Sequence, residues 1–482
     1  MSRLIINNSF CQLQSFSTDI LASVKTKLTY TNEEVIREKQ MIYSQLQRAK
    51  SRRQGPLISI LKERFKALGP DTVCWLDEYN RFPTGLLHLV RDLLGNYIQI
   101  DDRVKPESYQ LFRWNNKPHD LRPYQKEAVD AFIGRARGVL QMAVGSGKTR
   151  IAAQIIKELG VNVLFVVPSS ALLTQAYDVL ENSFGLKNVQ KVSTLDIKKN
   201  KKLKPIRIIT IQSLGSLQKQ GLAELLIDGI DLLVLDECHH SASESFTKLL
   251  PLFQGIYYRL GLSGTYLRND SKTLDLWGVS GEVVYDYSAS KATKEGYLTP
   301  VEFNIIKLKG KPSSNYQTEY KSNYGGLELL ESITDIVQNR ISDKDQILIL
   351  VERKEGCGHL INEYFKEQGI SCTYVTGDNS KQEVADAIEG FNDKKIRILL
   401  ASMILGEGCD IRSTDHLIMS TGGKSEISKT QAVGRAVRLY PGKKIAYVWD
   451  FNFQYCKYLS RHINLRVETY EKQFAGKVNY YE

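Results

Sequence analysis

One stretch, GVLQMAVGSGKTRIAAQIIKEL (residues 138–159), constrains the fold more than any other part of the chain. A β-rich run, a glycine-containing turn and a helical run follow one another in the order that a phosphate-binding loop requires. The turn consists of Gly145, Ser146 and Gly147. Its backbone N–H groups are expected to curl around phosphate oxygens, while Lys148 reaches the β and γ phosphates and the Thr149 hydroxyl holds Mg²⁺. The strict pattern has glycine where Met142 stands, so a chance glycine turn beside a surface lysine is the alternative.

A pair of acidic residues follows an apolar run further along the chain. The segment DLLVLDECHH ends a predicted strand with Asp236 and Glu237. Because adjacent residues on a strand point to opposite sides, the two carboxylates can take different roles. We expect Asp236 to hold the water shell of Mg²⁺, and Glu237 to orient the attacking water and accept its proton. A metal site made of Cys238, His239 and His240 is disfavoured, because three consecutive residues do not readily close a tetrahedron.

From about residue 115 onward, short β-branched runs alternate with helical stretches, which is typical of parallel sheets covered by helices on both faces. Two series of strands are predicted: 138–143, 162–167, 206–211 and 232–236, then 347–351, 372–376, 396–402, 416–420 and 446–451. They indicate two α/β lobes, residues 115–295 and 326–482. The stretch 296–325 is rich in Gly, Pro, Ser and Asn and is predicted to be the interlobe linker.

Residues 1–114 have a different pattern and are predicted to form a small α+β accessory domain. Strand-like pieces come first, and then a helix that Thr31 and Glu34 open with the spacing of a capping box. Further helices are predicted around 57–68 and from Leu86 to Leu94. The first helix runs into a group of basic residues: Arg48, Lys50, Arg52 and Arg53.

The overall charge indicates an anionic partner. The 482-residue chain has a formal net charge of +11, and Lys and Arg that neutralise phosphates release condensed counterions. An acidic membrane surface is the rival partner, although no run of 18 or more apolar residues predicts a membrane span. The seven cysteines form no CxxC pair, which favours reduced thiols and a cytoplasmic location.

Four motifs, AVGSGKT, DECHH, the triplet Ser263-Gly264-Thr265 and QAVGRAVR, resemble motifs I, II, III and VI of superfamily 2 helicases, in the family order. The resemblance implies two tandem RecA-like lobes, ATP as the nucleotide and nucleic acid as the track. The LRPYQ stretch, with Arg122 and Gln125, is similar to the family element that reads adenine. ASMILGEGCDI is similar to motif V, in which Gly408 and Asp410 would contact the ribose and couple it to the strand.

QAVGRAVR places Gln431, Arg435 and Arg438 at i, i+4 and i+7, on one face of a predicted helix. An arginine that enters from the opposite lobe would stabilise charge on the transferring phosphoryl group, so the active site is expected to form only when the lobes close. A basic helix facing solvent is the alternative. It fits poorly with Gly434, which weakens a helix yet permits a close approach.

The same resemblance implies that 168–175, 210–214, 351–356 and 375–378 line a groove for a nucleic-acid strand. The candidate contacts are Ser169, Gln212, Ser213, Arg353 and Thr376. Hydroxyl, amide and N–H groups can hold a phosphate backbone without reading bases. Ser and Gln also occur in ordinary loops, so the set is stronger evidence than its members.

The accessory domain is the part of the chain that indicates the substrate. Its segment CWLDEYNRFPTGLLHLV (74–90) resembles the N-terminal domain of phage UvsW-type helicases, which remodel branched DNA such as stalled forks and four-way junctions. The resemblance implies an ATP-dependent DNA helicase or translocase that acts as a monomer on branched or forked DNA, alongside recombination or replication proteins. A phage-encoded chain would act in the host cytoplasm. The basic group Arg48, Lys50, Arg52 and Arg53 favours duplex binding by this domain, whereas a domain that only packs on the first lobe is the alternative.

Three rival functions stay open. An RNA helicase would use the same ATP-hydrolysing motor. A nucleotide-gated clamp would bind DNA without hydrolysing ATP. A restriction-system motor would translocate on duplex DNA without separating strands. The combination of Glu237, Arg435 and Arg438 argues against the clamp, and no nuclease or methylase motif is evident for the restriction motor.

Overall fold

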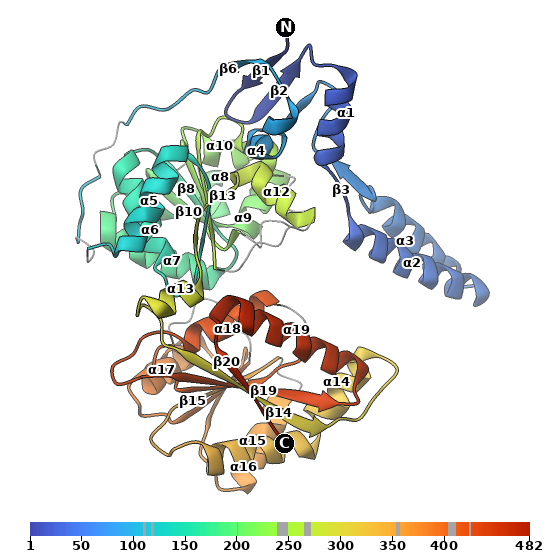
Figure 1. Cartoon of the computed structure of the whole chain (residues 1–482), viewed down its shortest axis with the longest axis vertical. Coiled ribbons are helices and arrows are strands. Elements are labelled where there is room, and N and C mark those ends of the chain that lie inside the picture. The colour runs from blue at the N-terminus through green and yellow to red at the C-terminus, as the bar shows by residue number, and fades with distance from the viewer. Residues whose placement is uncertain are drawn as a thin grey trace.

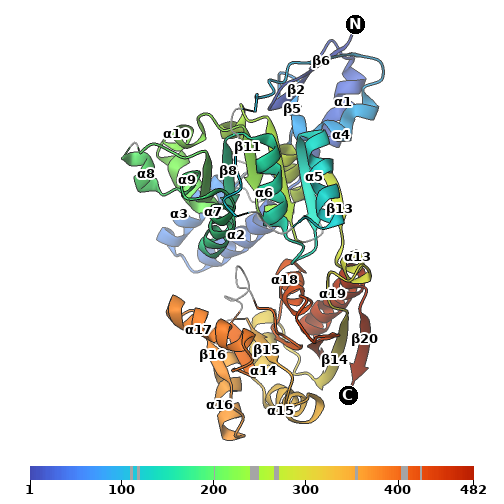
Figure 2. The same cartoon turned by 90° about the vertical axis from the view of Figure 1, so that its left-hand side faces the viewer.

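The computed structural model describes residues 1–108, 112–116, 120–199, 201–238, 249–264, 271–352, 357–402, 411–423 and 426–482. They form an N-terminal domain and two α/β lobes arranged one after another (Figures 1 and 2). Six residues that the sequence singles out lie outside the described residues: His239, His240, Thr265, Arg353, Gly408 and Asp410.

Lobe 1 is built on a seven-stranded sheet in the order β13-β7-β12-β11-β8-β10-β9, with every pair parallel. Its strands are β7 (Arg137–Met142), β8 (Val163–Val167), β9 (Val189–Lys191), β10 (Ile206–Thr210), β11 (Leu232–Leu235), β12 (Tyr258–Ser263) and β13 (Val283–Tyr287). Its helices include α5 (Pro123–Arg135), α6 (Lys148–Leu159), α7 (Ser170–Phe184), α8 (Thr194–Lys198), α9 (Ile211–Lys219), α10 (Ala223–Ile227), α12 (Ser271–Ser280) and α13 (Ala289–Lys294). The four central strands β7, β12, β11 and β8 are buried along their length except at Arg137, the first residue of β7, as expected for parallel strands covered on both faces.

Lobe 2 repeats this plan with the strand order β16-β17-β15-β18-β19-β14-β20, again all parallel. Its strands are β14 (Val301–Lys309), β15 (Ile347–Val351), β16 (Thr373–Val375), β17 (Ile398–Ser402), β18 (His416–Ser420), β19 (Ala446–Gln454) and β20 (Lys477–Tyr481). Its helices include α14 (Tyr316–Tyr324), α15 (Leu327–Asp335), α16 (His359–Glu367), α17 (Lys381–Asn392), α18 (Glu426–Ala436) and α19 (Lys457–Phe474). The predicted fold of two tandem parallel-sheet lobes is confirmed.

The prediction that 296–325 is an interlobe linker was wrong. This stretch contains β14, which pairs with β19 on one side and β20 on the other, and also α14. Most of the Gly, Pro, Ser and Asn residues of this stretch lie in the turns around β14 and α14 of lobe 2. A Cβ on Gly310 would stand 2.5 Å from the sulfur of Cys456, so this glycine marks a close approach and not a flexible connection.

The N-terminal domain has a four-stranded mixed sheet in the order β5-β2-β1-β6, from β1 (Arg3–Ile6), β2 (Phe10–Gln14), β5 (Arg81–Pro83) and β6 (Ile98–Asp101), with α1 (Thr18–Lys27) beside it. Two local predictions were wrong. The helix α2 (Glu33–Ser51) is capped by Asn32, whose side chain accepts the N–H of Val35, and not by Thr31. The predicted helix from Leu86 to Leu94 is instead three short turns: η1 (Thr84–Leu86), α4 (Leu87–Val90) and η2 (Arg91–Leu93).

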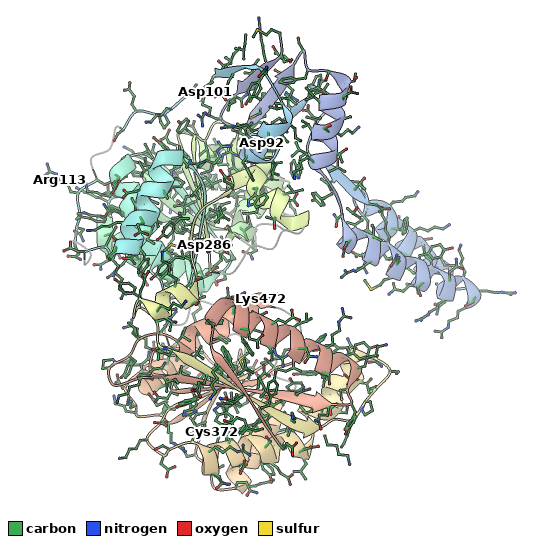
Figure 3. All side chains as sticks on the ribbon, in the orientation of Figure 1. Asp92, Asp101, Arg113, Asp286, Cys372 and Lys472 are labelled. Atoms are coloured by element: carbon green, nitrogen blue, oxygen red, sulfur yellow. The ribbon has the colours of Figure 1, made fainter. Side chains whose placement is uncertain are left out.

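Helices α2 and α3 (Gly55–Ala67) form a hairpin, here called the arm (residues 33–67), that projects from the N-terminal domain (Figure 1). Its side chains extend outward around both helices (Figure 3). A small core of its own holds the two helices together, around the buried side chains of Ile42, Ala49 and Leu61. The chain enters and leaves the arm through the antiparallel pair β3 (Thr29–Thr31) and β4 (Thr72–Cys74).

The root of the arm is fixed to lobe 1 by one buried carboxylate. Asp275 on α12 accepts hydrogen bonds from the hydroxyl of Tyr30 at 2.8 Å and from Trp75 Nε1 at 3.0 Å. A Cβ on Gly85 would stand 1.9 Å from the carbonyl oxygen of Trp277, so the two domains approach backbone to backbone. Because this contact tolerates no side chain at Gly85, the N-terminal domain is docked closely on lobe 1.

Candidate nucleotide site between the lobes

The phosphate-binding loop connects β7 to α6, as predicted. Gly145 and Gly147 have φ of 85° and 83°, a left-handed conformation that favours glycine, and Gly147 caps the start of α6. A Cβ on Gly147 would also stand 2.6 Å from Gln125 Nε2. Ser146 Oγ is buried and, within the described part of the chain, has no hydrogen-bond partner. The first turn of a helix leaves backbone N–H groups without internal partners, so this loop fits an anionic phosphate. Met142, which stands where the strict pattern has its first glycine, is buried in the core at the end of β7.

Lys148 and Glu237 meet next to this loop. Lys148 Nζ lies 3.6 Å from Glu237 Oε1, and the N–H of Gly264 donates to Glu237 Oε2 at 3.2 Å. Asp236 and Glu237 follow β11 and do not belong to it. Glu237 has φ of 44°, and Asp236 Oδ1 accepts the N–H of Glu237 at 3.0 Å. A turn therefore separates the two carboxylates, in place of the strand alternation that we expected.

Burial, and then the charge of Glu237, raise the pKa of Asp236 above its ordinary value, while Lys148 opposes the shift. A divalent cation would compensate for such a buried carboxylate. Asp236 and Thr149 supply the carboxylate and hydroxyl oxygens that Mg²⁺ prefers, so the residues present fit this ion. Among the residues that the structure describes, no group of three His, Cys, Asp or Glu is placed to hold a metal, and Cys238 is fully buried.

Gln125 joins the start of α5 to the phosphate-binding loop. Its Oε1 accepts the N–H of Arg122 at 3.0 Å, and its Nε2 donates to the carbonyl oxygen of Ser146 at 2.8 Å. The neighbouring Tyr124 donates from its hydroxyl to the same carbonyl at 2.9 Å, a contact that we did not expect although the LRPYQ motif contains this residue. The Arg122 guanidinium lies over the ring of Tyr297, 4.8 Å from its centroid. In this structure the amide nitrogen of Gln125 thus supports the loop, while its amide oxygen caps the start of α5.

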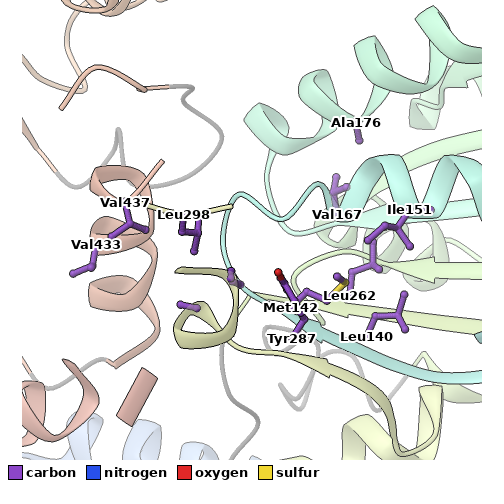
Figure 4. Close-up of a cluster of buried hydrophobic side chains, with 14 of the residues drawn as sticks. Leu140, Met142, Ile151, Val167, Ala176, Leu262, Tyr287, Leu298, Val433 and Val437 are labelled. Carbon is purple, nitrogen blue, oxygen red and sulfur yellow. The ribbon is translucent and has the colours of Figure 1, made fainter. Parts of the chain in front are cut away.

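Helix α18 of lobe 2 lies against the same loop. A Cβ on Gly434 would stand 2.5 Å from Val144 Cβ, and the side chain of Arg438 reaches within 3.7 Å of a Cβ placed on Gly145. Apolar side chains of both lobes share one cluster here, in which Leu298 lies between Val437, which follows α18, and the lobe 1 side chains Met142 and Tyr287 (Figure 4). The close approach expected at Gly434 is present.

Of the three residues predicted on one face of this helix, only two are helical. Helix α18 ends at Ala436, so Arg438 lies past its end and the assignment of Arg438 to the helical face was wrong. The N–H and hydroxyl of Thr299 donate to the carbonyl oxygens of Val437 and Arg438 at 2.8 and 3.2 Å. Arg435 is buried, and its Nη1 donates to the carbonyl oxygen of Gln431 at 3.1 Å. The break after Ala436 directs Arg438 toward Gly145.

A narrow cavity lies where the two lobes meet. Its lining includes Val144 and Gly264 from lobe 1 and Thr430 and Gln473 from lobe 2. Figure 3 marks the two sides of this boundary with Asp286 on β13 and Lys472 on α19. The loop, the acidic pair and the arginine-bearing helix therefore converge on one interlobe site.

The predicted strand contacts of lobe 1 lie together at the carboxyl ends of β8 and β10. Ser169 caps α7 by accepting the N–H of Leu172 at 3.4 Å, and Gln212 Nε2 donates to the carbonyl oxygen of Pro168 at 2.9 Å. Ser213 Oγ accepts the hydroxyl of Thr210 at 2.9 Å. Thr376 belongs to lobe 2, directly after β16, so it is not part of this group.

The basic group Arg48, Lys50, Arg52 and Arg53 lies at the tip of the arm, and all four residues are exposed. Arg53 has φ of 53° in the turn between α2 and α3. The four side chains therefore form a surface of their own at the tip of the arm, separate from the nucleotide site.

Two parallel-sheet lobes, with a phosphate-binding loop on one and an arginine-bearing helix on the other, define a nucleotide-driven motor of the RecA-like class. Residues 118–268 match the family described as type III restriction enzyme, res subunit, and residues 328–440 match the helicase conserved C-terminal domain; together they span more than half of the chain. The chain is a superfamily 2 helicase and an ATP-hydrolysing enzyme.

Relatives of known sequence span most of the motor. The ATP-dependent DNA helicase uvsW of Enterobacteria phage T4 is 24% identical over 409 residues, which cover 77% of this chain and 80% of that protein. The DNA 3'-5' translocase XPB2 of Sulfurisphaera tokodaii is 26% identical over 409 residues, 76% of this chain and 89% of the relative. A solved structure, the ATP-dependent type ISP restriction-modification enzyme LlaBIII bound to DNA, shares the fold at a TM-score of 0.57 and 18% identity, over 76% of this chain and 31% of that one. None of the helices in the described residues is long and apolar enough to cross a bilayer.

Proposed function

We propose that this helicase acts on DNA and remodels branched substrates by fork reversal and junction branch migration, in replication, recombination or repair. The observation that carries the proposal is the basic arm docked through Asp275 on an ATP-driven motor lobe. Relatives named as DNA helicase and DNA translocase support DNA as the track. The likeness to uvsW over most of its length supports the branched substrate.

In the proposed reaction, the loop residues Gly145 to Thr149 bind the phosphates of ATP, and Asp236 and Thr149 hold Mg²⁺. The metal ion, when bound, neutralises phosphate charge. When ATP binds, the ammonium group of Lys148 leaves Glu237 and contacts the phosphates. The movement is short, because Lys148 Nζ lies only 3.6 Å from Glu237 Oε1. Glu237, still held by the N–H of Gly264, then orients the attacking water and accepts its proton.

Lobe 2 completes the site from the other side. Arg435 and Arg438 stabilise the charge that develops on the γ-phosphoryl group, and Gln431 lies in the same helix. In the same proposal, Arg122 and Gln125 contact the adenine of ATP, and Gly408 and Asp410 contact its ribose. In the groove, Ser169, Gln212, Ser213, Arg353 and Thr376 hold one strand by its phosphates.

The arm provides a second DNA contact. Residues 39–62 contain no Asp or Glu, and the exposed Arg48, Lys50, Arg52 and Arg53 cluster at the tip. The arm stands apart from lobe 1 and extends to the level of the interlobe boundary (Figures 1 and 2). A basic element beside the motor groove can hold one duplex limb while the motor moves along another. We further propose a monomer on DNA, located in the cytoplasm, or the host cytoplasm for a phage-encoded chain, with recombination or replication proteins as partners.

A second candidate is a duplex translocase that does not separate strands. The match of residues 118–268 to a restriction-enzyme motor favours it. ATPase rates measured with single-stranded, duplex, forked and four-way DNA, and with matched RNA, distinguish the functions. Forked or four-way DNA should stimulate most. Equal stimulation by plain duplex would support the translocase, and stimulation by RNA alone would overturn the proposal. Lys148→Ala should abolish hydrolysis on every substrate.

A further inference from the structure

Helix α18 is held at both ends by lysine side chains. Near its start, Lys429 Nζ donates a hydrogen bond to the hydroxyl of Thr421, which follows β18. Past its end, Lys443 Nζ donates to the carbonyl oxygen of Ala436, the last residue of the helix, and to that of Arg438 at 3.4 Å. A cation at this place satisfies carbonyl groups that a helix end leaves unpaired.

The side chain of Lys429 is buried, which is unusual for lysine, and that of Lys443 is half-buried. Burial, and then the charge of Arg466, lower the pKa of Lys429 to about 7, and burial lowers that of Lys443 to about 8. In the described part of the chain, neither lysine has a carboxylate within ion-pair distance. The charges of Asp450 and Glu352 oppose the lowered pKa of Lys429, and that of Asp415 opposes the lowered pKa of Lys443, but burial outweighs them. Burying a cation that is only partly compensated costs free energy, so general stabilisation does not account for these residues.

The segment between β18 and α18 is also anchored to lobe 2 by an arginine. Arg466 on α19 binds Asp450 through Nε and Nη2, both at 2.8 Å, and its Nη1 donates to the carbonyl oxygen of Gly423 at 3.2 Å. Both carboxylate oxygens of Asp450 therefore pair with Arg466. The segment after β18 is held at Thr421 by Lys429 and at Gly423 by Arg466.

The opposite side of α18 lies against the phosphate-binding loop, at Gly434 and Val144. A shift of the helix would carry Arg435 and Arg438 with it. We propose that Lys429 and Lys443 are positioning residues for ATP hydrolysis, which set α18 against the loop without touching the nucleotide. This inference rests on the proposed roles of Arg435 and Arg438.

The test compares Lys429→Met and Lys443→Met with Lys444→Met, a matched control because Lys444 is the exposed neighbour of Lys443. Steady-state hydrolysis is measured in the full chain with forked DNA. A misplacement on the order of 1 Å lowers kcat about tenfold or more, whereas KM for ATP should stay within about threefold because the proposed phosphate and adenine contacts belong to lobe 1. Lys429→Arg, which keeps the cation, should recover much of the rate, and Lys444→Met should match the unmodified protein.

Melting temperatures identify variants that fail to fold. Thr421→Val is then the milder test, since it removes only the acceptor of Lys429, and its kcat should also fall. Unchanged kcat in both lysine variants would overturn the inference, as would an equal loss in Lys444→Met or no recovery with arginine. If Arg435→Ala and Arg438→Ala hydrolyse normally, the proposed roles of the arginines fail; if these two are inactive while the lysine variants are normal, only the inference fails.

Discussion

Gly434 of lobe 2 lies so close to Val144 of lobe 1 that a Cβ on the glycine would stand 2.5 Å from the valine Cβ and 2.8 Å from one of its methyl carbons. Gly434→Ala should therefore push α18 away from the phosphate-binding loop. We expect kcat for ATP to fall about tenfold or more, with nucleotide binding retained. Gly134→Ala is the control, because this glycine of α5 has nothing within 4 Å of its Cβ position. Equal rates for the two variants would contradict the contact.

Glu237→Gln should separate binding from hydrolysis. The glutamine oxygen can still accept the N–H of Gly264, but it cannot accept a proton from water. We expect a loss of hydrolysis of about 10²–10⁴-fold. ATP should bind at least as well, because Lys148 loses a charged partner at 3.6 Å. Filter binding of labelled ATP beside single-turnover hydrolysis measures both effects, and near-normal hydrolysis would remove Glu237 from its proposed role.

The motor core was predictable because its signals are local. The loop between β7 and α6 requires glycine at fixed spacing, and buried parallel strands appear as continuous apolar runs. The interlobe linker was mispredicted because Gly310 and Pro312 look like flexible-linker residues, whereas Gly310 is required by a close contact with Cys456 that joins distant parts of the chain. Similarly, the end of α18 before Arg438 depends on Thr299 in another segment. No local signal in the sequence predicts that Lys429 is buried or that Lys443 is half-buried.

Neutralising Arg48, Lys50, Arg52 and Arg53 together should weaken forked-DNA binding in low salt. If all four contact phosphates, the slope of log K against log salt should flatten by about 3 to 4 units. ATP hydrolysis without DNA should not change, since the arm lies outside the nucleotide site. Neutralising four exposed lysines of lobe 1 serves as the control: Lys198, Lys199, Lys201 and Lys202. An unchanged slope for the arm variant would show that the arm does not track DNA.

The stability difference between the unmodified protein and Lys429→Met should depend on pH. The pKa of Lys429 is about 7 in the fold and about 10.4 in an unfolded chain, so between these values the unfolded state binds more protons at this residue. The free energy of unfolding contributed by Lys429 therefore rises with pH, by up to about 2–3 kcal/mol from pH 7 to pH 9, and the buried charge costs most below pH 7. Thermal unfolding of both proteins at pH 6 and pH 9 should show the unmodified protein gaining on the variant. A gap independent of pH would contradict the lowered pKa.

The arm is an insertion between two paired strands, and its seam residues Val35, Ile42 and Ala49 recur every seven positions. Seven residues added to each helix would preserve that heptad register and lengthen the hairpin by about 10 Å. Neither the β3–β4 pairing nor the bonds of Asp275 would be disturbed. The reach of the arm and its attachment to the motor can thus change independently, because insertions of whole heptads alter only the length of the hairpin.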